Sequence, residues 1–323
     1  MQPVTTMPPK TLLRLILLFG LPAYFTVFVD HFLDPSNLYA MGQSFAYVGL
    51  ITLGLSLTMI AGEFDLSVAA TATVAGLLTV IFGAENAALG ILCAVAFGIA
   101  VGVINAALLP WLNVSSLVTT VGCMIFLIGL GFWLAGGRII GYDSFDPGDF
   151  LDQRLIWVIS PRLLLTLVFY AGITILLRAT TIGRDIYAAG SDRRAAIQSG
   201  ANVRLALMTC FVVSGVSASL AGGLLSLSLA SAAASLSNDI LLQAASAAII
   251  GGVALAGGIG SVWGVAAGVL ILTMLNNGLG LMNATSTEVV LLNGLLLLTV
   301  VLLDGRLADW FVASRRRRRL RRV

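Results

Sequence analysis

The feature that most constrains this chain is a series of long, almost uncharged apolar segments separated by short polar turns. Of its residues, 59% are hydrophobic and 10% are charged, whereas soluble domains carry about 25% charged residues. A soluble fold could not cover so much apolar surface, because its exterior must face water. In a bilayer every backbone polar group must be paired within the protein, and long continuous runs favour helices over barrel strands, which alternate polar and apolar residues. The sequence therefore predicts an all-α integral membrane protein.

The segments are each close to the ~20 apolar residues that a spanning helix needs. We expect a polytopic bundle of about ten transmembrane helices forming one domain over residues 12–303, with a short N-terminus (1–11) and a basic C-terminal tail (304–323). The expected spans are 12–29, 38–61, 66–83, 87–109, 117–135, 155–177, 204–228, 240–256, 262–281 and 289–303.

The arginines set the orientation, because cytoplasmic loops are enriched in basic residues. With the N-terminus inside and ten spans, all of the 18 basic residues fall inside except Arg138, Arg154 and Arg162. We therefore expect both termini and the basic loop 178–203 on the cytoplasmic side, and the acidic loop 136–154 outside. The arginine-rich run at 315–322 is expected to anchor the tail to anionic lipid headgroups rather than to bind nucleic acid.

Several chemistries have no residues to support them in this sequence. Lys10 is the sole lysine and follows two prolines, so it cannot belong to a GxxxxGK[ST] phosphate loop, and we expect no ATP site. The three cysteines lack CxxC spacing and His31 is the sole histidine, so no metal or catalytic site is expected. Proton-coupled carriers usually place ionisable residues within the bundle, and we expect none in mid-span. A sodium-coupled carrier that uses backbone carbonyls stays open as an alternative.

The loop 178–203 contains a pattern typical of a short capped helix. Ser191 or Asp192 can accept hydrogen bonds from the first N–H groups of a helix, and Gly200 can end that helix in the left-handed conformation. Between them, Ala195 and Ala196 are expected to give an exposed face of small residues. A helix this short needs a partner to be ordered, so the segment is either a docking element or a solvated connector.

Three motifs of the chain resemble those of ATP-binding-cassette (ABC) importer permeases of the ribose type, within the branched-chain amino acid/ribose permease superfamily. The first is Gly62-Glu63-Phe64-Asp65-Leu66-Ser67-Val68, which resembles a GGxDLSVG turn, although Glu63 stands where glycine is commonest. The second is the glycine-rich run from Gly251 to Gly264. The third lies in the loop and comprises Gly183, Arg184, Ile186, Tyr187, Ala188, Gly190, Ala195, Ala196, Ser199, Gly200 and Val203.

The resemblance implies a permease subunit that imports a small sugar or sugar-like solute by alternating access. It implies location in the bacterial cytoplasmic (inner) membrane, a second permease subunit, an external solute-binding protein and a cytoplasmic ATPase that holds the ATP and Mg²⁺. It also implies that the loop 178–203 couples to that ATPase. The coupling residues expected from it are Gly183, Arg184, Gly190, Asp192, Ala195, Ala196, Ser199 and Gly200. An ion-coupled secondary transporter is the alternative.

Two groups of polar residues near or within the spans are further candidates. Asp65, with Glu63 and Ser67, either caps the following helix, where a carboxylate is favoured, or forms a gate. The second group would line a translocation path, although amide side chains can also simply join helices. Its members are Gln43, Asn105, Gln243, Asn276 and Asn277.

Overall fold

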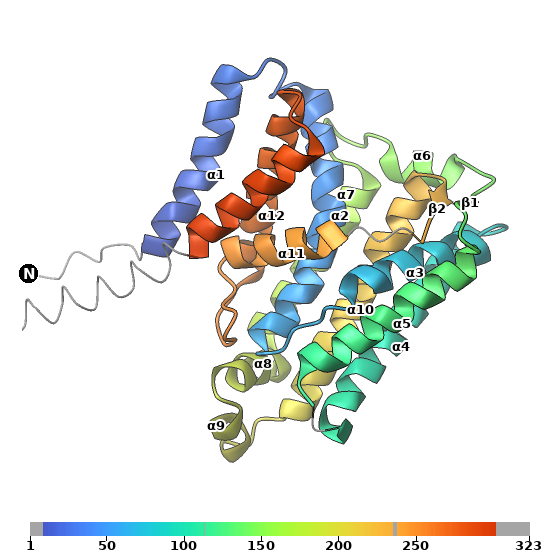
Figure 1. Cartoon of the computed structure of the whole chain (residues 1–323). Helices are drawn as coiled ribbons and strands as arrows, with labels where there is room; N and C mark the ends of the chain where they lie inside the picture. Colours follow the sequence, from blue (N-terminus) through green and yellow to red (C-terminus); the bar gives the residue numbers. More distant parts are fainter. Residues whose placement is uncertain (1–8, 113, 235–237, 302–323) are drawn as a thin grey trace, which may run out of the picture.

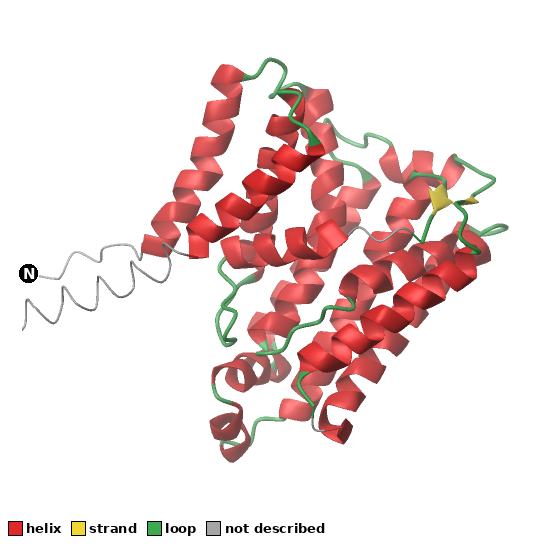
Figure 2. Cartoon of the chain, in the orientation of Figure 1, coloured by secondary structure: helices red, strands yellow, loops and turns green. Residues whose placement is uncertain are grey.

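In the computed structural model, which describes residues 9–112, 114–234 and 238–301, the chain is a bundle of helices with one two-stranded sheet (Figures 1 and 2). The tail expected at 304–323 lies outside this range. The helices are α1 (Pro9–Phe28), α2 (Pro35–Ile60), α3 (Val68–Phe82), α4 (Ala87–Leu112), α5 (Ser116–Ala135), α6 (Asp146–Asp152), α7 (Pro161–Ala179), α8 (Thr181–Ser191), α9 (Arg193–Gln198), α10 (Val203–Ser228), α11 (Asn238–Ile250) and α12 (Val262–Leu281). The strands are β1 (Ile140–Gly141) and β2 (Ser231–Ala232), and a helix at Ser286–Val301 follows α12.

The expected all-α membrane architecture is confirmed. Among the described residues, six helices are long and apolar enough to cross a membrane, namely α2, α4, α5, α7, α10 and α12. The other four expected spans coincide with shorter apolar helices, at Arg14–Phe28, Val68–Phe82, Asp239–Ile250 and Ser286–Val301. The 15 residues of α3 extend about 22 Å, less than the ~30 Å of a hydrocarbon core. Helix length therefore supports six crossings, and the further four are part of the proposal below.

Two of the expected span boundaries are wrong. Residues 155–160 form a loop, and α7 starts at Pro161, where proline suits the first helical position and the Ser160 hydroxyl accepts a hydrogen bond from the Leu163 N–H. Helix α11 stops at Ile250 instead of continuing to residue 256. It stops there because Gly252 adopts a φ of 92°, a left-handed angle that breaks a helix and that glycine tolerates.

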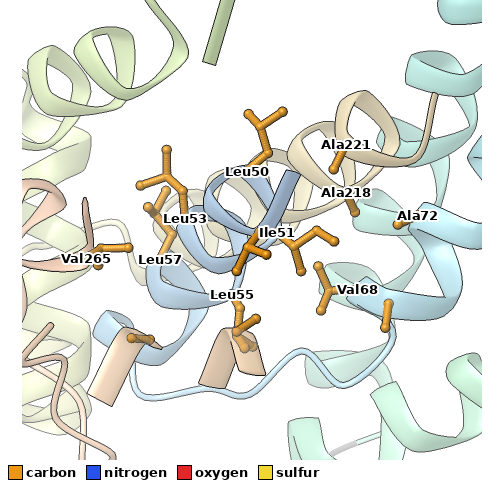
Figure 3. Packing of buried hydrophobic residues seen from close by; sticks show 14 of the residues in the cluster. Leu50, Ile51, Leu53, Leu55, Leu57, Val68, Ala72, Ala218, Ala221 and Val265 are labelled. Carbon is orange, nitrogen blue, oxygen red and sulfur yellow. The ribbon is translucent and has the colours of Figure 1, made fainter. Parts of the chain in front are cut away.

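Helix α10 lies between α2, α3 and α4 and contacts all three. The contact with α4 is close because it is made of small residues. A Cβ added to Gly98 would lie 2.7 Å from the Gly215 carbonyl carbon, and one added to Gly102 would lie 2.6 Å from Val212 Cα. This is the close backbone approach that small residues permit in lipid. Figure 3 shows part of the adjoining core, including Leu50, Ile51, Val68, Ala72, Ala218 and Ala221.

The acidic loop and the basic loop lie at opposite ends of the bundle (Figure 1). At one end, β1 pairs antiparallel with β2, so that Ile140 lies opposite Ala232. The Tyr142 hydroxyl donates a 2.7 Å hydrogen bond to the Gly83 carbonyl, which ties this loop to the end of α3. Helices α8 and α9 lie at the other end. The structure thus separates the two loops as the arginine distribution predicted.

Candidate functional site

The short helix expected at the centre of the basic loop is present as α9. Its N-terminal cap is Asp192, whose Oδ1 accepts hydrogen bonds from the N–H groups of Arg194 (2.9 Å) and Ala195 (3.0 Å). Gly200 follows the helix with a φ of 85°, which is the left-handed ending that its position indicated. Asp192 also ends α8, so the two helices meet at one residue.

The sequence did not predict α8. Thr180 caps it, because its hydroxyl accepts a hydrogen bond from the Gly183 N–H. Gly183 is buried against the end of α7, where a Cβ would lie 2.6 Å from the Leu177 carbonyl carbon. Arg184, the next residue, is exposed. The glycine is therefore needed for the sharp turn from α7 into α8, which fixes the direction of the basic loop.

The C-terminal end of α8 fits against two other segments through glycine backbones. A Cβ on Gly190 would lie 2.6 Å from the Gly258 nitrogen, and a Cβ on Gly62 would lie 3.4 Å from Gly190 Cα. Gly258 in turn donates a 2.8 Å hydrogen bond to the Ile60 carbonyl at the end of α2. Three segments far apart in the sequence therefore meet at this point, which we call the glycine seat (Gly62, Gly190, Gly257 and Gly258).

A tyrosine reinforces the glycine seat. The Tyr187 hydroxyl of α8 donates a 2.9 Å hydrogen bond to the Gly260 carbonyl, in the turn between α11 and α12. Burial raises the pKa of the Tyr187 phenol, and the positive charge of Arg178 opposes that shift. The phenol therefore keeps its proton and remains a donor at physiological pH.

The exposed face of α9 differs from the one expected. Ala195 is exposed, but Ala196 is only 3% exposed and packs into the main core of this chain. The expectation that Ala196 faces a partner is therefore wrong, because one alanine of an adjacent pair turns inward on a helix that lies on the bundle surface. Ile197 takes the outward position and is 60% exposed. Gln198, Ser199 and Gly200 are exposed beside it.

Glu63 lies in the connector between α2 and α3, which we define as residues 62–67. Its Oε1 is 2.5 Å from Nη2 of Arg193, the first residue of α9. The connector therefore has a polar contact with the basic loop.

Asp65 does not cap α3 through the N–H groups of its first turn. It is 2% exposed, and its Oδ1 accepts hydrogen bonds from the Ser67 N–H (3.0 Å) and the Ser67 hydroxyl (2.6 Å). Its Oδ2 accepts one from the Ser214 hydroxyl on α10, at 2.7 Å. Asn105 on α4 donates to Ser67 Oγ at 2.9 Å. These four residues form a buried polar cluster that joins the connector to α4 and α10.

Two hydroxyl residues of α5 also bind the connector, although they were not among the residues predicted from the sequence. The Phe64 N–H donates to Ser116 Oγ and the Leu66 N–H donates to Thr120 Oγ1, each at 3.1 Å. The Thr120 hydroxyl lies 3.0 Å from the Phe64 carbonyl oxygen. Ser116 and Thr120 are four residues apart, so both lie on one face of a helix. This spacing is the sequence feature that could have identified them.

The amides expected to line a path do not form one cluster among the described residues. Gln43 on α2 accepts a 2.7 Å hydrogen bond from Arg162 Nε, and Arg162 also pairs with Asp152 at 3.0 Å. Asn105 belongs to the Asp65 cluster. Gln43 and Asn105 therefore join helices in separate places.

The remaining path candidates lie on α11 and α12. Asn277 exchanges two hydrogen bonds with Asn37 at the start of α2, at 2.8 and 2.9 Å. Gln243 is half-buried. Three of the path candidates carry a buried amide atom that has no hydrogen-bond partner among the described residues, namely Asn276 Oδ1, Gln43 Nε2 and Asn105 Oδ1. A passing polar solute could satisfy these three atoms.

Comparison with known proteins places this chain in a family. The family described as "Branched-chain amino acid transport system / permease component" matches residues 38–301. The L-arabinose ABC transporter permease protein AraH of Azospirillum brasilense is 31% identical over 85% of this chain and 82% of its own. The autoinducer 2 import system permease protein LsrC of Photorhabdus luminescens is 30% identical, covering 92% and 89%. The ribose import permease protein RbsC of Escherichia coli K12 is 29% identical, covering 93% and 94%. No solved structure matches the chain.

The fold and these matches define the chain as a multi-pass membrane permease. It belongs to the branched-chain amino acid transport system / permease component family. The resemblance to ribose-type importer permeases is thereby confirmed.

Proposed function

We propose that this chain is the membrane-spanning subunit of an ABC importer that carries a small sugar or sugar-like solute into the bacterial cytoplasm. The named cargoes of the three relatives support this solute class, since they are L-arabinose, ribose and autoinducer 2. Membership of the permease family favours this function over an ion-coupled secondary transporter. In this proposal the chain makes ten membrane crossings, with both termini cytoplasmic, in the inner membrane.

The transport cycle proposed for the chain is alternating access without covalent chemistry. A partner ATPase holds ATP and Mg²⁺, and its movement biases the bundle between two states. A second permease subunit completes the path, and an external solute-binding protein delivers the solute. Of the path candidates, Gln43, Asn105 and Asn276 are the proposed solute contacts, because each has a buried amide atom without a partner among the described residues.

The observation that carries the proposal is the face of α9. It exposes Ile197 beside Ala195 and Gln198, at the end of the bundle opposite the acidic loop (Figure 1). An apolar side chain next to small residues can enter a pocket on a partner protein, and such buried anchors dominate interface energies. We assign this face to the ATPase, together with the loop residues Gly183, Arg184, Gly190 and Asp192 that orient it.

Reconstitution tests the function directly. We would place the chain in proteoliposomes with its partner ATPase and solute-binding protein, and follow radiolabelled L-arabinose and ribose. Uptake is expected only with ATP and the binding protein together. Uptake driven by an imposed proton or sodium gradient in the absence of ATP would instead establish a secondary transporter.

The proposed orientation predicts a labelling pattern in whole cells. Gln153, which follows α6, and Gln198, the last residue of α9, are both exposed. Helices α6 and α9 lie at opposite ends of the bundle (Figure 1). In a cysteine-free background, Gln153→Cys is expected to react with a membrane-impermeant maleimide in intact cells, and Gln198→Cys only after the cells are opened. The opposite order of reactivity would reverse the topology.

We expect the exposed aspartates of the acidic loop to attract the solute-binding protein to the permease. Asp143, Asp146 and Asp149 are exposed, whereas Asp152 is occupied by its ion pair with Arg162. Exposed charges of one sign raise encounter rates with a partner of opposite sign, and salt screens the effect. Changing the three exposed aspartates together to asparagine is expected to raise the concentration of binding protein needed for half-maximal uptake, by up to about tenfold at low salt. If wild type and variant need the same concentration of binding protein for half-maximal uptake at every salt concentration, these aspartates do not steer the binding protein.

A further inference from the structure

One ion pair joins α9 to the transmembrane bundle. Arg193 on α9 contacts Glu63 in the connector, 130 residues earlier in the chain. The side chain of Glu63 is 11% exposed and that of Arg193 is 47% exposed, so the carboxylate is largely shielded and the guanidinium faces solvent. Among the described residues, this is the side-chain hydrogen bond that links α9 to the segment between α2 and α3.

The opposite side of the connector is attached to other helices. The Phe64 and Leu66 N–H groups donate to hydroxyls of α5, and Asp65 accepts from Ser214 of α10. The residues that follow Glu63 therefore alternate between a bond to α5 and a bond to α10. Few residues separate Glu63 from these attachments to α5 and α10.

Within the glycine seat, the contact between Gly62 and Gly190 lies beside the pair and is made by backbone atoms alone. Gly62, which precedes Glu63, has a φ of 80° and lies against Gly190. Backbones that meet at glycines come close, but they present no side chain that would oppose sliding. The ion pair is thus the side-chain link between α9 and the connector among the described residues.

We propose that Glu63 and Arg193 are positioning residues that transmit the movement of α9 to the connector, and through it to α5 and α10. This inference rests on the proposed function, since it requires an ATPase that moves α9. Partly exposed ion pairs contribute little to stability, so loss of the pair is expected to leave assembly intact and to affect the use of ATP for transport.

The test compares uptake with ATP hydrolysis in the reconstituted complex. Glu63→Gln and Arg193→Gln are expected to co-purify the ATPase normally and to hydrolyse ATP, while solute uptake per ATP hydrolysed falls about fivefold or more. The charge-exchanged double variant Glu63→Arg with Arg193→Glu is expected to recover much of that ratio, because it restores an ion pair across the same contact. Glu85→Gln, in an exposed turn between α3 and α4, is the control and is expected to match wild type.

The outcomes separate this inference from the proposed function. If wild type shows no ATP-driven uptake, the proposed function fails before any variant is compared. If wild type transports and both single variants keep the wild-type ratio of uptake to hydrolysis, the pair does not transmit movement. A charge-exchanged variant no better than the single variants would also overturn the inference.

Discussion

Replacing Ile197 with aspartate is expected to abolish ATP-driven uptake and to remove the ATPase from the purified complex. Ile197 is 60% exposed on α9, and the proposed docking places it in a pocket of the partner. An aspartate there would lose the apolar contact and bring an unpaired charge into the interface. Losing one such anchor costs about 2 kcal/mol or more, which weakens binding at least about 30-fold.

The measurement is co-purification of the ATPase with a tagged permease, alongside uptake in proteoliposomes. Ile156→Asp is the matched control, because Ile156 is also an exposed isoleucine but lies in the loop before α7. We expect it to retain the ATPase fully. Normal ATPase recovery with Ile197→Asp would show that α9 is not the docking element.

Replacing Asp65 with alanine is expected to destabilise the protein substantially. The carboxylate accepts three hydrogen bonds, two from Ser67 and one from Ser214, at a position that is 2% exposed. Without it, buried donors lose their acceptor, and each unsatisfied donor costs about 1–3 kcal/mol. Because the serine hydroxyls can rotate to other acceptors, we expect a total loss of roughly 2–4 kcal/mol.

The readout for Asp65→Ala is the midpoint of thermal unfolding of the detergent-solubilised protein. Ser214→Ala removes one donor but leaves the two from Ser67, so its loss should be only about 1 kcal/mol. An unfolding midpoint for Asp65→Ala equal to that of wild type would mean that the cluster contributes nothing to stability.

The apolar runs were sufficient to predict an all-α membrane fold, because a bilayer leaves the backbone few alternatives. The ends of those helices were harder to predict. The 155–160 segment is apolar, yet it is a loop, since Ser160 and Pro161 together start α7. Hydropathy indicates which segments of a chain can lie in lipid. It carries no information on the capping hydrogen bonds and the glycine backbone angles that decide where a helix begins and ends.

The partners of the polar residues depend on long-range contacts, which a single sequence does not show. Asp65 and Ser214 are 149 residues apart, and nothing in the local sequence of either indicates the other. The cap formed by Asp192 was predictable because its bonds are local. The inward orientation of Ala196 was not, since Ala195 beside it has the same side chain and only the position of α9 against the core distinguishes them.

Asp192 ends α8 and also begins α9, so no spare residue lies between the two helices. A junction of this kind can accept changes of side chain but not changes of length. One residue inserted in α9 between Asp192 and Ile197 would move Ile197 by about 100° around the helix axis, away from its present outward direction. Across proteins that share this junction, we therefore expect the number of residues between the glycine seat and the outward face of α9 to be constant, even where the residues themselves differ.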